Sequence, residues 1–203
     1  MKTILVPIDF SDEAKYACKV AASIAKQTGS EIILLHMLDI PSTSVDPMVD
    51  GNLGGGAQTI FYMKTIHKKF GEFKAFPFFD GLKVVESVIF KKAFQGVIEE
   101  SSKNNVELIV MGSQGATGIK EMLVGSNTEK VVRQSDIPVL VIKQDLENFK
   151  VDDIIFASEF SETSKTTFPK VIKFANTFNA KLHLLFINTA RNFEPTEVTN
   201  TKL

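Results

Sequence analysis

The sequence predicts an α/β fold built on a parallel sheet with helices on both faces. Runs of β-branched and aliphatic residues alternate along the chain with segments that place apolar residues at helical spacing. The apolar runs, such as residues 4–8 and 106–110, are hydrophobic at nearly every position, which is typical of strands buried on both sides. We therefore expect a doubly wound sheet of five parallel strands.

The first half of the chain is expected to supply two strands and two helices. Residues 4–8 form the first strand, Ser11 can cap the helix after it, and Gly29 marks the end of that helix. Residues 31–38 form the second strand. Residues 39–56 hold two prolines and a glycine cluster, which is typical of a mobile loop. Both helices have apolar faces: Ala14, Ala17, Cys18, Ala21 and Ala25 in the first, and Met63, Ile66, Phe70 and Phe73 in the second, near residues 58–73.

Residues 82–143 are expected to complete the sheet. A third strand is expected near residues 82–90 and a helix near residues 93–104. Residues 107–111 form the fourth strand, a further helical pattern ends near Ser135, and residues 138–143 form the fifth strand.

An internal repeat then begins at a constant offset of 150 residues. Residues 4–11 are echoed by residues 154–161, and the echo continues through a helix and a second strand. The predicted helix carries Phe168, Val171, Ala175 and Phe178 on one face. We therefore expect a first domain over residues 1–145 and a partial second copy, strand-helix-strand, over residues 151–203. Such a copy is expected in a truncated tandem protein, or in a chain whose second copy docks onto another chain.

Composition excludes several classes of function. The net charge is −1 with no long basic run, so a nucleic-acid surface is not expected. Cys18 is the single cysteine, lies on an apolar helical face, and is expected to pack rather than to react. No apolar run approaches about 18 residues and no signal peptide is visible, so we expect a cytoplasmic protein without a membrane partner.

The most informative motif follows the fourth strand. The segment 111–115, Met-Gly-Ser-Gln-Gly, is followed nine residues later by 125–128, Gly-Ser-Asn-Thr. Glycines at a strand-to-helix junction let the backbone approach a ligand closely, and the first N–H groups of a helix attract an anion. The spacing predicts a nucleotide phosphate site, although an ordinary tight turn would also use glycines.

Four blocks of the sequence together resemble the universal stress protein family: residues 4–11, residues 32–36, the glycine motif, and residues 137–143. The resemblance implies the strand order 3-2-1-4-5 and a site where the winding of the sheet reverses. It also implies an ATP-binding protein of the stress response that switches with nucleotide state, with Mg²⁺ held through the phosphates and at most slow, weak ATPase activity.

Site residues follow from the same resemblance. The loop backbone and the helix start that hold the phosphates correspond to Gly112, Gly115, Gly125, Ser126, Asn127 and Thr128. Asp9 is expected against the nucleotide, Met37 at the adenine edge through its backbone, and Pro7, Ile8 and Met111 beside them. Asp9 ends the first strand and Gly112 follows the fourth, so both fall at the carboxyl edge of a parallel sheet.

Two of these residues have simpler interpretations. Asp9 could order its turn with Ser11. Ser126 and Glu129 have the spacing of a capping box, with Ser126 as the N-cap and the Glu129 side chain turned back to its own helix. His36 is expected to be a partly buried histidine at a strand end, and no cluster of residues predicts a metal site or a catalytic group.

Two other functions remain open on sequence grounds. A nucleotide-consuming enzyme is one, but no base or nucleophile stands out beyond Asp9. A nucleotide-free dimerisation module is the other. In either case residues 138–143 are expected at a sheet edge, where the apolar strand pairs with its equivalent in another chain. We therefore expect a homodimer or a larger assembly through this strand and the second copy.

Overall fold

The computed structural model describes residues 1–38, 54–113, 125–159, 162–186, 193 and 197. The chain divides into two compact units, Met1–Glu147 and Asn148–Leu203. Within the described part, no helix is long and apolar enough to cross a membrane.

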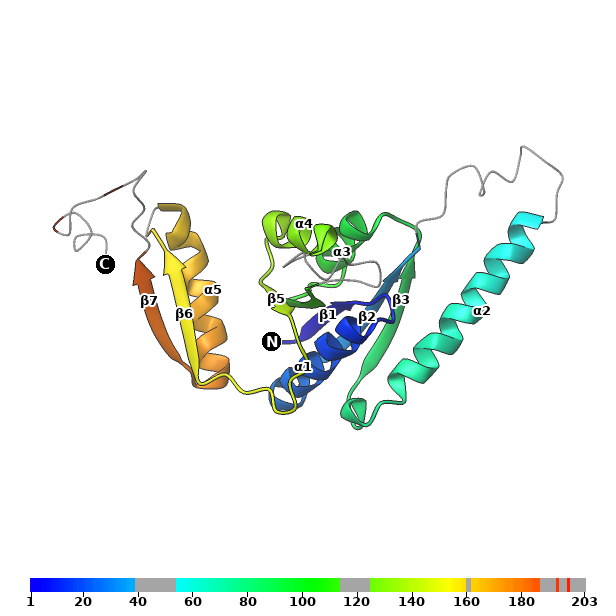
Figure 1. Ribbon diagram of the computed structural model, residues 1–203, viewed down its shortest axis with the longest axis horizontal. Coiled ribbons are helices and arrows are strands. Elements are labelled where there is room, and N and C mark those ends of the chain that lie inside the picture. The colour runs from blue at the N-terminus through cyan, green and yellow to red at the C-terminus, as the bar shows by residue number, and fades with distance from the viewer. Residues whose placement is uncertain (39–53, 114–124, 160–161, 187–192, 194–196, 198–203) are drawn as a thin grey trace. The chain divides into compact units, whose positions relative to one another are not determined.

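The first unit is a five-stranded parallel sheet in the order β3-β2-β1-β4-β5, as predicted (Figure 1). Chain order alternates strand and helix, so the winding reverses on either side of the central β1. Its elements are β1 (Thr3–Pro7), α1 (Asp12–Thr28), β2 (Glu31–Met37), α2 (Gly54–Lys74), the 3₁₀-helix η2 (Pro77–Phe79), β3 (Val84–Ile89), α3 (Ala93–Lys103), β4 (Leu108–Gly112), α4 (Ser126–Gln134) and β5 (Val139–Ile142).

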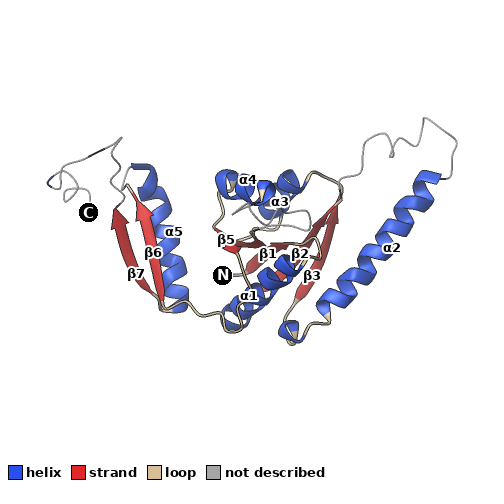
Figure 2. Cartoon of the chain, viewed as in Figure 1, coloured by secondary structure: helices blue, strands red, loops and turns tan. Residues whose placement is uncertain are grey.

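Helix α1 covers one face of this sheet, and α3 and α4 cover the other (Figure 2). Ser11 caps α1 by accepting the Ala14 N–H, and Gly29 ends it in the left-handed conformation at φ 69°, so both predicted boundaries are confirmed. The predicted alanine face of α1 is buried. Cys18 is fully buried within it, and burial raises the pKa of its thiol, as expected of a packing residue.

The opposite face of the sheet builds a second core. Leu5, Ile33 and Ile109 point from three strands toward Val97 of α3 and Val131 of α4. All five side chains are at most 5% exposed. Strands β1 and β4 are buried at every position, which explains why their sequences show no alternation of polar and apolar residues.

Helix α2 begins earlier than the sequence predicts. Residues 54–56 were expected in a loop because they are glycines, yet they form the first turn of α2. Helix propensity is a weak guide when the following residues form a continuous helix. The predicted apolar face is confirmed, with Ile66, Phe70 and Phe73 buried. The rest of the expected loop lies outside the described residues.

The second unit is a strand-helix-strand: β6 (Asp153–Ser158), α5 (Glu162–Phe178) and β7 (Lys181–Phe186), with the two strands parallel. Its elements begin 150 residues after β1, α1 and β2. Thr3 pairs with Glu31, and Asp153 pairs with Lys181. Both helices have 17 residues. The predicted face of α5 packs on β6, where the Phe168 and Phe156 rings lie 5.4 Å apart.

Candidate functional site

Apart from Gly115, which lies outside the described residues, the predicted site residues lie at or near the ends of β1, β2 and β4 and the start of α4 in the first unit. Strands β1, β2 and β4 are parallel and finish at Pro7, Met37 and Gly112 on one edge of the sheet. The chain leaves β1 through Ile8, whose N–H donates to the Leu35 carbonyl at 2.8 Å. This edge is where a doubly wound sheet binds ligands.

Asp9 lies just beyond this edge and is exposed. Its Oδ1 accepts the Ser11 N–H at 3.0 Å and the Ser11 hydroxyl at 2.5 Å. The same hydroxyl accepts the Ala14 N–H, so Asp9 and the cap of α1 form one hydrogen-bonded turn. The simpler role considered for Asp9 is therefore present, and it holds the carboxylate in a fixed place at the carboxyl edge of the sheet.

Phe10, between these two residues, was not singled out from the sequence. Its backbone is left-handed, with φ 65°, which is unfavourable for an aromatic residue. Its ring packs 4.7 Å from the His36 ring, 5.4 Å from Phe70 and 5.5 Å from Phe73. His36, half-buried as expected, is fixed by a 2.8 Å hydrogen bond between its Nδ1 and the Ile8 carbonyl. The recurring phenylalanines of α2 were the available signal for this cluster.

Gly112 ends β4 directly against the start of α1. A Cβ atom at this position would lie 3.0 Å from Glu13 Cβ and 3.1 Å from the Glu13 backbone carbon and oxygen. A side chain at this position would therefore crowd the start of α1, so the packing of the protein itself favours glycine here. Sequence reasoning could not find this contact, because Glu13 lies far from Gly112 in the chain.

Three hydrogen bonds join the end of β4 to its neighbours. The Ser113 N–H donates to the Ile142 carbonyl at 2.8 Å, and the Gly125 N–H donates to the Ser113 carbonyl at 2.6 Å. The Thr128 hydroxyl donates to the Gly112 carbonyl at 3.0 Å. Gly115 lies outside the described residues.

The start of α4 differs from the predicted capping box. Gly125 is the N-cap in an extended conformation, no side chain caps this end, and Ser126 is already helical. An N-cap residue must be extended to accept the N2 or N3 N–H, so Ser126 cannot serve as the cap. Glu129 does turn to its own helix, where Oε1 accepts from Arg133 Nε at 2.9 Å. Among the described residues, therefore, no side chain caps the first N–H groups of α4.

The two methionines contribute to the core. Met111 is 7% exposed in the cluster under α3 and α4, and Met37 packs against the same cluster. Pro7 and Ile8 are also buried. These residues therefore form part of the core at the carboxyl edge of the sheet. Among the described residues, no group of three or more acidic, cysteine or histidine side chains could hold a metal ion.

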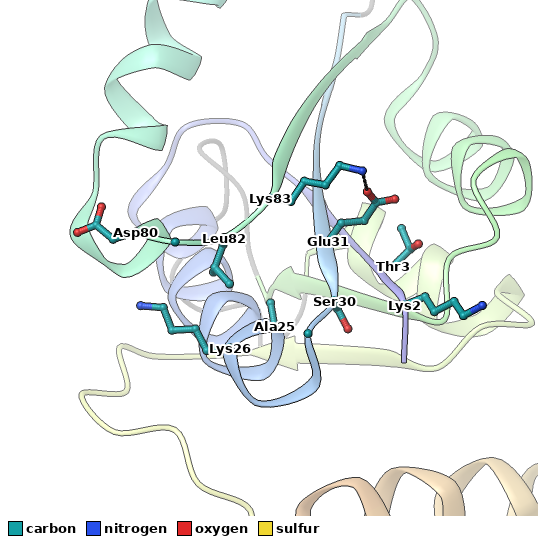
Figure 3. Close-up of a pocket in the computed structure, with 11 residues that line it drawn as sticks. Lys2, Thr3, Ala25, Lys26, Ser30, Glu31, Asp80, Leu82 and Lys83 are labelled. Atoms are coloured by element: carbon teal, nitrogen blue, oxygen red, sulfur yellow. Dashed lines mark ion pairs between the residues drawn. The ribbon is translucent and has the colours of Figure 1, made fainter.

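Figure 3 shows an open cavity of about 670 Å³ in the same unit. It is lined by the amino ends of β1 and β2, the end of α1 and the turn before β3, and it includes the ion pair between Lys83 and Glu31. None of the predicted site residues lines it. It lies at the amino edge of the sheet, opposite the predicted crevice.

The family model for the universal stress protein family matches residues 1–143. The chain belongs to this family. Universal stress protein MJ0577 of Methanocaldococcus jannaschii is 29% identical over 154 residues, which are 70% of this chain and 95% of the relative. A solved structure of hypothetical protein MJ0577 has a TM-score of 0.61 at 30% identity, covering 72% of this chain and 98% of that one.

A second solved structure shares the fold. It is the universal stress protein from Archaeoglobus fulgidus in complex with dAMP, with a TM-score of 0.50 at 20% identity. The similarity covers 70% of this chain and 98% of that chain.

Proposed function

We propose that this protein binds ATP at the carboxyl edge of β1 and β4 and acts as a nucleotide-dependent regulatory switch of the stress response. The start of α4 is the observation that carries the proposal. Gly125, the N-cap beside the end of β4, has no side chain to cap the first N–H groups of α4, and among the described residues no side-chain cap occupies this helix start, which is the kind of terminus that attracts phosphate. A universal stress protein with the same fold was solved with dAMP, which supports an adenine nucleotide.

Each predicted residue has a role in this proposal. The backbone of Gly112, Gly115 and Gly125 and the first turn of α4 at Ser126 and Asn127 bind the phosphates. Mg²⁺ is held through those phosphates. The nucleoside is expected to contact Asp9, backbone atoms of Met37, and the wall formed by Pro7, Ile8 and Met111. Thr128 was assigned to the same phosphate group.

Calorimetry with ATP and Mg²⁺ tests the proposal. We expect saturable binding of one ATP per chain, and mass spectrometry of the denatured protein should detect a copurified adenine nucleotide. Turnover should be slow, because Asp9 is the one acid that sequence reasoning places at the nucleotide. Rapid ATP hydrolysis would favour a nucleotide-consuming enzyme, and the absence of any binding would favour a nucleotide-free dimerisation module acting in the cytoplasm.

We also propose that the chain forms a homodimer through β5. This strand is an edge of the sheet, and Val139, Leu140 and Val141 are only half-buried. An apolar edge strand with unpaired backbone groups favours pairing with an equivalent strand.

The second unit is proposed to be a partial copy of the first domain, with boundaries at residues 1–145 and 151–203. The repeated register and helix length support this proposal. Residues 151–186 hold a two-stranded sheet, too small to bury a core alone. Limited proteolysis of the full chain tests whether another chain completes this sheet. Rapid digestion of residues 151–203 from a dimer that still binds ATP would refute such docking.

A further inference from the structure

Thr128 shares the first turn of α4 with two exposed residues, Ser126 and Asn127, but its own side chain is buried. It is 4% exposed, and its hydroxyl donates to the Gly112 carbonyl at 3.0 Å. A threonine hydroxyl has one proton to donate. A phosphate oxygen requires a donor, and this proton is already bound to the backbone of β4. The side chain of Thr128 is therefore unsuited to the ligand role that the sequence suggested.

A second hydrogen bond acts beside the first. The Gly125 N–H donates to the Ser113 carbonyl at 2.6 Å, and Ser113 is 5% exposed. The two bonds connect consecutive residues of the β4 end, Gly112 and Ser113, to the cap and the first turn of α4. We call this pair of bonds the α4 brace. It therefore holds the start of α4 against the end of β4.

We propose that Thr128 is a positioning residue, which through the α4 brace sets where the N–H groups of α4 meet the phosphates of a nucleotide. The proposal rests on the ATP binding proposed above. Its physical reason is that N–H groups bind an anion well only when they are held at the correct place before the ligand arrives. Without the threonine proton, the Gly112 carbonyl loses a buried partner and the helix start can shift.

Two variants separate the hydroxyl from the shape of the side chain. Thr128→Val keeps the volume and removes the donor, whereas Thr128→Ser keeps the donor. In the nucleotide-free protein, we expect the Gly125 amide to exchange with solvent several-fold faster in Thr128→Val than in the parent. In Thr128→Ser, the Gly125 amide should exchange with solvent at nearly the same rate as in the parent. Circular dichroism at the same temperature verifies that all three proteins are folded.

The nucleotide measurements show whether the α4 brace positions phosphates. Thr128→Val should bind ATP about tenfold more weakly, the effect of one buried hydrogen bond. Adenosine, titrated by NMR, should bind the parent and the variant equally, since it lacks phosphates. Thr128→Ser should restore most of the ATP affinity. A general loss of structure would weaken the binding of both ATP and adenosine.

Each outcome decides one of the two proposals. Unchanged Gly125 exchange in Thr128→Val overturns the α4 brace, whether or not ATP binds. Equal losses for ATP and adenosine overturn the positioning role. If the parent binds no ATP, the proposed function fails, and the Gly125 exchange alone then decides whether Thr128 holds α4 to β4.

Discussion

Gly112 lies where the end of β4 meets the first turn of α1, and a side chain there would be crowded. The atoms that a Cβ would meet include the backbone of Glu13, which cannot rotate away as the end of a flexible side chain can. A residue expected to let a ligand approach is therefore also needed for two elements of the protein to approach each other. The first effect to measure for a substitution of Gly112 is therefore the change in the free energy of unfolding.

We predict that Gly112→Ala lowers the free energy of unfolding by about 1–3 kcal/mol, the usual cost of overpacking a tight site. Gly71→Ala is the matched control. Gly71 lies inside α2 and its Cβ would meet nothing within 4 Å. The control should be more stable by about 0.5–1 kcal/mol, because alanine favours a helix. Urea denaturation of both variants makes the comparison, and equal stabilities would contradict the prediction.

Ser126 is predicted to contribute directly to phosphate binding. It is exposed in the first turn of α4, and its hydroxyl is not needed as a cap. Ser126→Ala should lower the affinity for ATP by about 10–150-fold, since a hydrogen bond to a charged group contributes about 1.5–3 kcal/mol. Ser102→Ala is the control, because Ser102 is exposed on α3 and bonds the Ile98 carbonyl of its own helix. Calorimetry that finds equal affinities in the two variants would exclude this role.

At the scale of elements, α2 is tied to the edge strand β3 by charge. Glu86 of β3 accepts from Lys74 at 3.0 Å and from His67 at 3.2 Å, both on α2. Partial burial raises the pKa of Glu86. The hydrogen bonds and charges of Lys74 and His67 lower this pKa, and together their effect is larger than that of burial. The net pKa in the folded chain lies below its ordinary value of 4.5.

This shift fixes the sign of a pH effect. A lowered carboxyl pKa stabilises the folded chain above pH 4.5, and the stabilisation is lost as pH falls through the lower folded pKa. We expect Glu86→Gln to cost about 0.5–1 kcal/mol at pH 7, as for a partly exposed ion pair. The difference between the parent and this variant in the free energy of unfolding should shrink as the pH falls below 4.5. Glu72→Gln, on the exposed side of α2, is the control. Urea unfolding at several pH values measures this difference, and a constant difference would refute the assignment.

The elements themselves were largely predictable, and their long-range contacts were not. Ser11 and Gly29 act locally, so the sequence places both ends of α1 correctly. The capping box at Ser126 failed because the spacing to Glu129 does not reveal which residue is extended. The left-handed Phe10 and the contact of Gly112 with Glu13 depend on residues distant in the chain. For the candidate site, the sequence correctly placed Asp9 and Gly112 at the carboxyl edge of the sheet, but it did not predict the buried hydroxyl of Thr128.

For the whole molecule, the exposed edge of β5 predicts association. The Pro138 and Ile142 carbonyls accept from β4, so the backbone of the alternate residue Val141 faces the free edge. Val141→Pro removes an outward N–H while leaving the bonds to β4. We expect light scattering to give a dimer for the parent and a monomer for this variant at equal concentration. A monomeric parent, or a dimeric variant with unchanged circular dichroism, would contradict pairing through β5.

Because the two strand-helix-strand segments share a register, α1 and α5 could be exchanged to make a chimeric protein from this chain alone. Because α1 and α5 have equal lengths between strands in the same register, one helix can replace the other without altering a loop. Their inner faces differ in bulk: Cys18 and Ala21 of α1 correspond to Phe168 and Val171 of α5. Grafting α5 onto the first sheet would therefore crowd a filled core, and grafting α1 onto the second would leave voids. The exchange would show how far helix volume alone determines which of the two strand-helix-strand segments a helix can complete.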